Sequence, residues 1–240
     1  MSGPRLNPDA WLTKRLGKPS FHMAGKVNGL SLEQSPVVQK LAEQNLFVDA
    51  KIPVADVASV ESVCRMGFSL IDTNVQFIIS LSDIPAVSMD GITFAAPEMA
   101  SAIGEIAATS FSEDRFHRDP AIPDSVADNL KRCWATNFFT GERGDWMVVA
   151  CIGKNPVGFL QLVRTADGGF LIDLIAVTED ERGRGLACAM IAFARDNCGC
   201  EGQAVVGTAI ANTRSIGLYE KMGFRLCGAQ YVFHHHGATC

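Results

Sequence analysis

Hydrophobic and polar positions follow two different periods in the second half of the chain. Residues 170–177 form an apolar run that only Asp173 interrupts, as is typical of a buried strand. From Leu186 onward, apolar residues such as Met190 and Ile191 recur at helical spacing. A short glycine-containing turn joins the two segments. The pattern therefore predicts a strand, a turn and a helix, in that order.

The same periods predict further elements on both sides of this unit. Residues 82–90 are polar and contain proline, which indicates a linker, and residues 112–122 form a loop dense in polar and aromatic groups. Residues 1–30 are expected to form an opening loop and a short strand. We expect strands over 46–52, 68–71, 75–81, 92–94, 146–152, 157–164, 204–210 and 224–236, and helices over 31–44, 55–66, 97–111, 125–138 and 213–222.

Two short segments of the chain resemble each other. RMGFSL at residues 65–70 is similar to KMGFRL at residues 221–226, and the likeness extends backwards through a helix and a strand. In this alignment Asp56 is equivalent to Asn212, and Val63 is equivalent to Tyr219.

The first copy of this repeat has no counterpart of the glycine-containing turn. This favours a degenerate half-repeat, while the alternative is that two unrelated helices both end in Gly-Phe. Together with the linker, the repeat predicts a degenerate half-domain over residues 1–88 and a catalytic domain over residues 89–240.

Composition narrows the function classes. The chain has 240 residues, of which 48% are hydrophobic and 20% charged, as in an ordinary globular protein. A net charge of −5 argues against a dedicated nucleic-acid binder. No apolar run reaches membrane-spanning length and the N-terminus lacks a signal-peptide pattern, so we expect a cytoplasmic protein with no membrane partner. Side chains alternate along a strand, so His234–His236 cannot all bind one metal ion, and we expect no metal.

The turn has the chemistry of an anion site. Gly183 and Gly185 stand where the predicted helix begins, so the backbone there can approach a ligand closely. The first N–H groups of a helix are unpaired and lie at the positive end of its dipole, which suits a phosphate or pyrophosphate. Arg182 and Arg184 add positive charge. The alternative is an ordinary strand-to-helix turn.

Two motifs resemble those of the GNAT superfamily of acyl-CoA N-acetyltransferases. The turn, Arg182-Gly183-Arg184-Gly185-Leu186-Ala187, is similar to the R/Q-x-x-G-x-G/A signature, and Asn212, Tyr219 and Gly223-Phe224 follow the second pattern, N-x6-Y-x3-G-F. The resemblance implies an α/β (α+β) fold, in which a mixed central sheet is flanked by helices. It also implies acetyl-CoA as co-substrate. The implied coenzyme contacts are Ile175, Ala176, Val177, Arg182, Gly183, Arg184, Gly185, Leu186, Ala187 and Asn212.

The resemblance also implies the reaction, which is direct attack of an amine on the thioester. Tyr219 is then the candidate general acid, since a phenol with a pKa of about 10 is protonated at neutral pH. The candidate base is either Asp173, which interrupts an apolar strand, or His117 in the polar loop. An Asp that bonds a neighbouring loop is the alternative for Asp173.

The loop SFSEDRFHRDPAIP and the segment GFSLIDTNVQF resemble sugar-nucleotide acetyltransferases of the dTDP-fucosamine acetyltransferase type. This implies an acceptor amine at position 4 of a dTDP-linked amino-dideoxysugar. The implied acceptor contacts are Arg115, Phe116, His117 and Asp119, unless the loop is simply solvated around one buried aromatic. Another small amine or a protein N-terminus is the alternative acceptor, and a non-catalytic acyl-CoA-binding regulatory module is the alternative function. The expected partner is a small molecule, and the expected assembly includes a homodimer.

Overall fold

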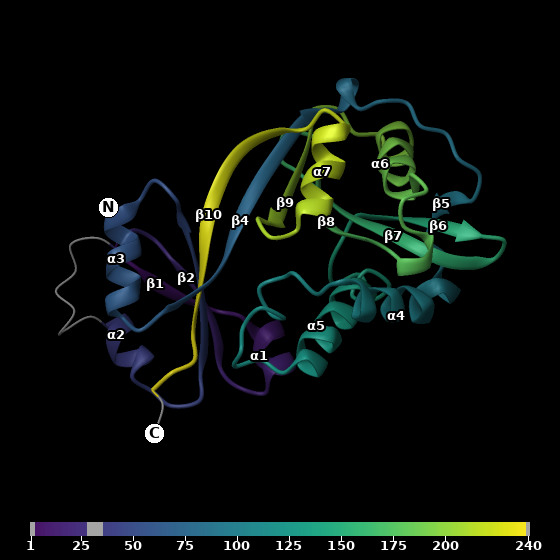
Figure 1. Cartoon of the computed structure of the whole chain (residues 1–240). Coiled ribbons are helices and arrows are strands. Elements are labelled where there is room, and N and C mark those ends of the chain that lie inside the picture. Colours follow the sequence, from purple (N-terminus) through teal and green to yellow (C-terminus); the bar gives the residue numbers. More distant parts are fainter. Residues whose placement is uncertain (1–2, 28–35, 239–240) are drawn as a thin grey trace.

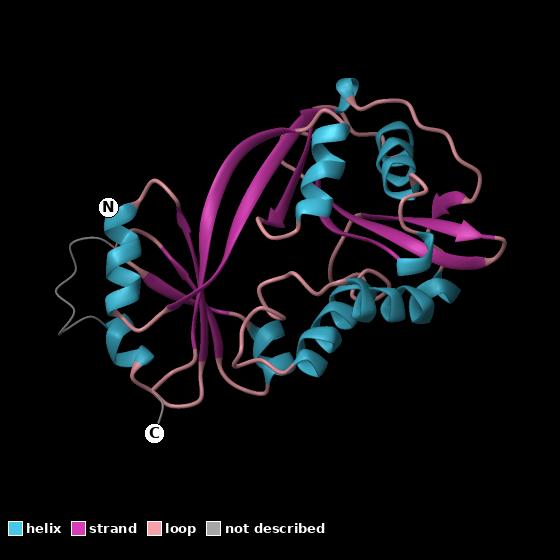
Figure 2. Ribbon diagram, in the orientation of Figure 1, coloured by secondary structure: helices cyan, strands magenta, loops and turns pink. Residues whose placement is uncertain are grey.

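One continuous sheet runs through the computed structural model, which describes residues 3–27 and 36–238 (Figures 1 and 2). In the described part of the chain its strand order is β1-β2-β3-β10-β4-β9-β8-β7-β6-β5. The strands are β1 (Arg5–Pro8), β2 (Ser20–Ala24), β3 (Phe47–Pro53), β4 (Ser69–Ser80), β5 (Ile92–Phe94), β6 (Trp146–Ile152), β7 (Asn155–Arg164), β8 (Phe170–Val177), β9 (Gln203–Ala209) and β10 (Arg225–His235).

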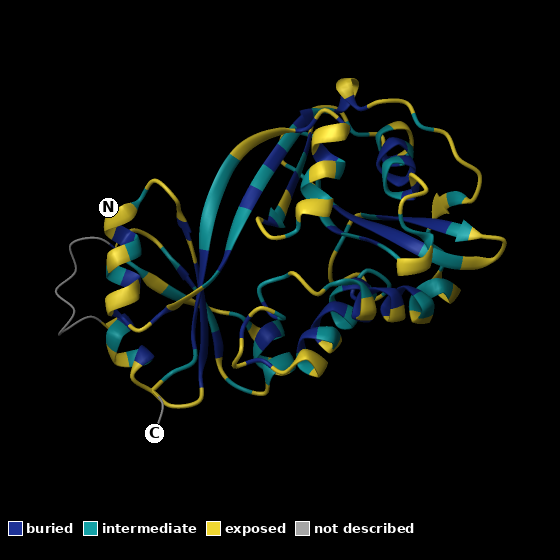
Figure 3. Cartoon of the chain, viewed as in Figure 1, coloured by how far each residue is buried: buried dark blue, intermediate teal, exposed yellow. Residues whose placement is uncertain are grey.

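Helices cover both faces of the sheet. They are α1 (Ala10–Leu16), α2 (Pro36–Leu41), α3 (Val57–Arg65), α4 (Ala100–Ser110), α5 (Asp124–Thr136), α6 (Leu186–Asn197) and α7 (Thr213–Lys221). Figure 1 shows α6 and α7 on one face of the C-terminal strands and α4 and α5 on the other. Exposed positions concentrate on helices and loops, and buried ones along the strands (Figure 3). Within the described residues, no helix has the length and apolarity needed to cross a bilayer.

The mixed sheet confirms the predicted fold class. β2 pairs with β3, and β8 with β9, in parallel, while the other neighbours are antiparallel. Several details differ from expectation, and the described part of residues 1–30 holds two strands, β1 and β2, where one was expected. Strands predicted over 68–71 and 75–81 form the single strand β4, because β10 pairs with it on both sides of the polar residues between them. The expected helix over 31–44 is seen as α2, and its residues 31–35 lie outside the described residues.

Helix α1 is absent from our sequence prediction, although its ends carry recognisable signals. The Asp9 side chain accepts a hydrogen bond from the Leu12 N–H at 2.8 Å, and Gly17 ends the helix with a φ of 66°. A helix of seven residues is too short to display a clear period. Leu12 is buried against Phe47 and Phe116, so packing rather than pattern fixes this helix.

The two copies of the repeat face each other across β4 and β10. In both, a polar side chain caps the helix: Asp56 bonds the Ser59 N–H at 3.2 Å and Asn212 bonds the Ser215 N–H at 3.1 Å. β4, which follows α3, pairs with β9 of the second copy, and β10, which follows α7, pairs with β3 of the first. Each half therefore completes the sheet of the other (Figure 2). The division at residue 88 stays a prediction.

Candidate active site

The sheet opens between β8 and β9. The two strands pair only where Phe170–Ile172 lies beside Ala204–Val206. Beyond this point β8 runs on to Val177 and β9 to Ala209, with no further pairing among the described residues. Leu174–Val177 are thus paired with β7 on one side and with no described strand on the other. Such an edge can bind an extended, amide-containing ligand by strand-like hydrogen bonds.

A β-bulge at Asp173 sets the direction of the side chains on this strand. The register between β7 and β8 shifts there, and a bulge residue has no partner of its own. Ile172, before the bulge, packs into the core under α6 and α7, whereas Leu174, after it, packs with α4. Of the predicted coenzyme contacts, Ile175 and Val177 are half-buried on the α6 side. Ala176 is buried toward α4.

The glycines of the turn after β8 have the unusual backbone conformation that the sequence predicts. Gly183 and Gly185 have φ values of 81° and 82°, a left-handed conformation that favours glycine. Within the described chain, nothing accepts a hydrogen bond from the backbone N–H groups of residues 183–187. α6 begins at Leu186 with no side-chain cap, so these donors are available at its positive end.

The arginines of the turn have separate roles. Arg182 donates from Nε to the Val177 carbonyl at 3.0 Å, which ties the turn to the end of β8. Arg184 is exposed, and its guanidinium lies 2.8 Å from Glu181. Arg182 therefore fixes the position of the turn, and Arg184 is the more accessible positive charge.

Helix α7 carries the second motif. Asn212 caps it through its side-chain oxygen, which leaves the amide NH₂ group for other partners. The Tyr219 ring is buried, with the rings of Phe77 and Phe224 centred 5.9 Å and 5.5 Å away. Burial raises the pKa of the Tyr219 phenol. The phenol is therefore protonated at neutral pH, as a general acid must be.

Asp173 is fully engaged with other side chains. Arg143 donates to both of its oxygens at 2.6 Å, Trp134 Nε1 donates at 2.8 Å and the Gln161 amide at 3.2 Å. Three of these donors reach Oδ2 and one reaches Oδ1, so both carboxylate oxygens are engaged. Asp173 in this arrangement holds Arg143 and Trp134 in place, and the geometry does not support its predicted role as base.

His117 also lacks a free lone pair. Its Nδ1 lies 2.5 Å from Asp114 and its Nε2 lies 3.0 Å from Asp128. The hydrogen bond to Asp114, reinforced by Asp128, raises the pKa of His117 despite its burial. An imidazole between two carboxylates is favoured in its protonated form, so the geometry does not support this residue as base either.

The remaining loop residues attach the loop to the N-terminal half. Phe116 is buried against Phe47, and the Arg115 guanidinium bonds the buried carboxylate of Asp49. Asp119 is buried and accepts hydrogen bonds from His234 and His236. Of the four predicted acceptor contacts, Arg115 borders the cavity described below, and the other three hold the loop in position.

Asp119, His234 and His236 have the composition of a metal site, and their ligand atoms lie within 4.8 Å of one another. The histidine nitrogens, however, lie 2.6 Å and 2.8 Å from the same carboxylate oxygen, which are hydrogen-bond distances. Lys18 lies 3.1 Å from His236 Nδ1 and can only donate there. This places the His236 proton on Nε2, facing Asp119, where a metal ligand would need a lone pair. The cluster is therefore a hydrogen-bonded chain.

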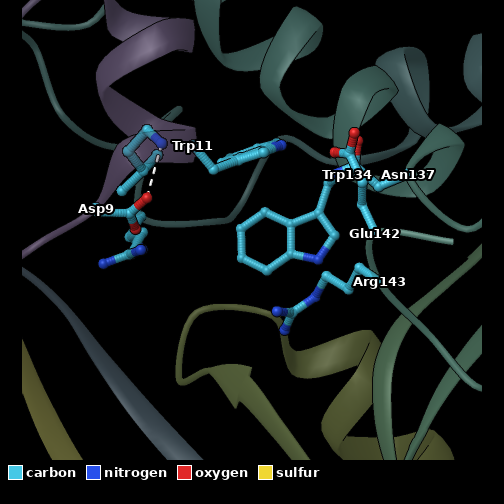
Figure 4. A pocket seen from close by; sticks show the side chains of 8 residues that line it. Asp9, Trp11, Trp134, Asn137, Glu142 and Arg143 are labelled. Atoms are coloured by element: carbon cyan, nitrogen blue, oxygen red, sulfur yellow. Dashed lines mark hydrogen bonds between the residues drawn. The ribbon is translucent and has the colours of Figure 1, made fainter. Parts of the chain in front are cut away.

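A cavity of about 380 Å³ lies between α1 and α5 (Figure 4). The rings of Trp11 and Trp134 meet edge to face in it, with centroids 5.5 Å apart. With its amide turned to satisfy both neighbours, Asn137 accepts from Trp11 Nε1 at 2.7 Å. The lining residues are Asp9, Trp11, Leu12, Arg115, Trp134, Asn137, Glu142 and Arg143.

Sequence reasoning missed most of this cavity. Its residues come from three separate segments, and their spacing follows no motif. The available signal was compositional: two of the three tryptophans of the chain, Trp11 and Trp134, stand among polar residues in segments of helical length.

Comparisons with known proteins identify a family for this chain. A model of the acetyltransferase (GNAT) family matches residues 103–224. The spore coat polysaccharide biosynthesis protein SpsD of Bacillus subtilis (strain 168) is 30% identical over 140 residues, which are 58% of this chain and 48% of that protein. The chain thus spans about half the length of this curated relative.

Solved structures share the fold. A conserved protein of unknown function from Staphylococcus epidermidis matches with a TM-score of 0.66 and 15% identity, over 92% of this chain and 85% of its own. A GCN5-related N-acetyltransferase from Sphaerobacter thermophilus matches with a TM-score of 0.59 and 16% identity, over 99% and 78%. At such low identities the likeness concerns the fold alone.

Proposed function

The chain belongs to the GNAT acetyltransferase family, and on that premise we propose that it acetylates the amino group of a nucleotide-linked amino sugar. As a member of this family it is an acyl-CoA-dependent N-acetyltransferase that uses acetyl-CoA as co-substrate. The observation that carries the coenzyme part of the proposal is the unpaired edge of β8, which ends in a turn of free N–H groups. An extended pantetheine arm with a pyrophosphate at its end matches these two features.

The proposed reaction uses Tyr219 of α7 and the backbone of β8. The amine nitrogen forms a bond to the thioester carbonyl carbon, and the carbon–sulfur bond breaks. The departing sulfur takes the phenolic proton of Tyr219, which solvent then replaces. The amine gives up its proton to water, since Asp173 and His117 are both engaged elsewhere. A backbone N–H of β8 near Val177 stabilises the negative charge on the carbonyl oxygen.

The acceptor class rests on two kinds of support. The relative SpsD is described as a protein of spore coat polysaccharide biosynthesis, which links a similar sequence to sugar chemistry. The loop that resembles sugar-nucleotide acetyltransferases places Arg115 at the cavity. The finer assignment, a dTDP-linked 4-amino-4,6-dideoxysugar, belongs to this proposal, as do the cytoplasmic location and the homodimer.

The test is mass spectrometry of an acceptor panel incubated with acetyl-CoA. The panel holds dTDP-linked 4-amino sugars, UDP-amino sugars, polyamines and short peptides. We expect acetylation of the dTDP-amino sugars alone. Acetylation of peptides or polyamines alone would keep the family activity and reject the sugar acceptor. Binding of acetyl-CoA without acetylation of any acceptor would favour the non-catalytic acyl-CoA-binding module.

A further inference from the structure

We propose that the cavity between α1 and α5 binds the amino-sugar ring of the acceptor, and that the N-terminal segment supplies the residues that select it. This inference rests on the proposed function and assigns a site to its acceptor. It gives the N-terminal half of the chain, which lacks a coenzyme turn, a part in substrate recognition.

One wall of the cavity comes from the N-terminal segment. Helix α1 lies on the side of the N-terminal strands that faces α5, opposite α2 and α3 (Figure 1). Leu12 fixes the helix in a buried cluster with Phe116 and Leu130. Asp9 and Trp11 are thereby held at the cavity.

The charges in the cavity favour a hydroxylated amine over a diphosphate. Both guanidiniums are already balanced: Arg143 by the buried carboxylate of Asp173, and Arg115 by that of Asp49. Asp9 and Glu142, in contrast, form no ion pair with a described residue. The pKa of Arg143 is raised mainly by its hydrogen bond to Asp173 and further by the charge of Asp9, so Asp9 acts on this cation without contact. The two carboxylates accept hydrogen bonds from hydroxyl and ammonium groups and repel phosphate.

The aromatic side chains suit a sugar ring. The Trp11 and Trp134 rings stand at 73° to each other and form an aromatic corner, with Asp9 and Arg143 on opposite sides of it (Figure 4). Guanidinium groups lie over both rings: Arg143 is 4.8 Å from the centre of the Trp134 ring and Arg15 is 5.7 Å from that of Trp11. A pyranose presents apolar C–H groups on its faces and hydroxyls around its edge. A cavity of about 380 Å³ falls in the usual range for small ligands, roughly 300–1,000 Å³.

The cavity is connected to the strand that offers its edge to the coenzyme. Trp134 and Arg143 both donate to Asp173, the bulge residue of β8. Asp173 precedes Ile175 by two residues, roughly 7 Å along a strand. A ring in the cavity therefore lies beside the unpaired part of β8, with its nucleotide directed away from the two carboxylates.

The experiment follows ligand binding without turnover, through tryptophan fluorescence. Two of the three tryptophans line the cavity, so an occupant will change the emission. The probes are galactosamine, cyclohexylamine and dTDP. We expect galactosamine to quench the fluorescence, cyclohexylamine to bind at least tenfold more weakly, and dTDP to leave the emission unchanged.

Three variants test whether the change in fluorescence arises from a ligand in the cavity. Asp9→Asn keeps a good helix cap and Glu142→Gln keeps the shape, so each removes only a charge. We expect each to weaken galactosamine binding about tenfold and to raise the acceptor KM while the acetyl-CoA KM stays unchanged. Trp11→Phe should reduce the quenching. Asp56→Asn, the same change at the cap of α3, is the matched control and should behave as wild type.

Two outcomes separate this inference from the proposed function. Galactosamine binding that depends on Asp9, without acetylation of any sugar in the panel, would keep the cavity assignment and reject the proposed reaction. Sugar acetylation with unchanged acceptor KM in both Asp9→Asn and Glu142→Gln would overturn the cavity assignment alone. Quenching by dTDP, but not by galactosamine, would also overturn it.

Discussion

At the scale of single residues, position 219 shows what one side chain adds to a shared backbone. Val63 and Tyr219 occupy equivalent places in the two copies, and both are buried. The backbone around them is alike: Phe68 N–H bonds the Val63 carbonyl at 3.1 Å, and Phe224 N–H bonds the Tyr219 carbonyl at 2.9 Å. Valine is sufficient for hydrophobic packing at this position, so packing does not explain the hydroxyl group of Tyr219.

The Tyr219→Phe variant tests that reason. The phenyl ring retains the packing against Phe77 and Phe224, whereas the proton donor is lost. We expect kcat to fall by about 100-fold, the lower end for general acid catalysis. The Kd for acetyl-CoA, measured by calorimetry, should stay within twofold. An equal loss of binding and turnover would make Tyr219 a structural residue.

Asp173→Asn distinguishes a base from a positioning residue. The asparagine amide presents N–H groups to Arg143, which is itself only a donor, so the bidentate contact is lost. We expect the acceptor KM to rise about tenfold, while the pH at which kcat is half-maximal on its acid side stays the same. If Asp173 were the base, the variant would instead lose this acid limb of the pH–rate profile.

At the scale of elements, the unit of function is the strand β8 with its turn and helix. The bulge directs Asp173 to α5, the unpaired edge faces β9, and the turn exposes N–H groups before α6. If β8 were paired along its whole length and α6 had a side-chain cap, the backbone groups of the strand edge and of the turn would be hydrogen-bonded within the protein. The element therefore leaves hydrogen-bonding groups available to a ligand.

Gly185→Val should abolish coenzyme binding. A branched side chain at a φ of 82° is strained by about 1–3 kcal/mol, and it would stand over the N–H groups of the turn. We expect the Kd for acetyl-CoA to rise at least tenfold. Gly199→Val is the control, since this glycine has a φ of 61°, open space around it and a place just beyond the other end of α6. The Gly199→Val variant should lower Tm by a similar amount and leave the Kd for acetyl-CoA unchanged. Normal acetyl-CoA binding by Gly185→Val would show that the coenzyme site lies elsewhere.

At the scale of the whole molecule, β4 and β10 join the two halves. Phe77 and Ile79 of β4 belong to the same core as Met190 of α6, while Phe233 of β10 packs in the N-terminal core. Each half thus contributes a strand to the hydrophobic core of the other. The loop between α4 and α5 adds a polar connection, through Asp119 and the end of β10.

The isolated fragment 89–240 tests the predicted domain division. It lacks β4, so β9 loses its antiparallel neighbour and the core loses Phe77 and Ile79. Removing large buried side chains costs about 2–5 kcal/mol each, a large part of the stability of a domain. We expect no cooperative thermal transition by circular dichroism, in contrast to the full chain. A cooperative fragment that binds acetyl-CoA would establish residues 89–240 as an independent domain.

Features that depend on local spacing could be predicted from the order of the residues. The strand, turn and helix around Gly183 and Gly185, the capping positions Asp56 and Asn212, and the family resemblance all follow from residues close together in the chain. Hydrophobic periodicity and glycine conformation involve residues that are close together in the chain, so both can be recognised in the sequence.

Features that depend on contacts between separate segments could not be predicted in this way and are visible only in the folded chain. The sequence leaves either Asp173 or His117 as the candidate base, and only the folded chain shows that Arg143 bonds the first and Asp128 the second. The cavity brings residues 9–12 beside residues 134–143, and a hydrophobic cluster rather than any motif aligns them. Such contacts arise from packing of the whole chain, which no local pattern records.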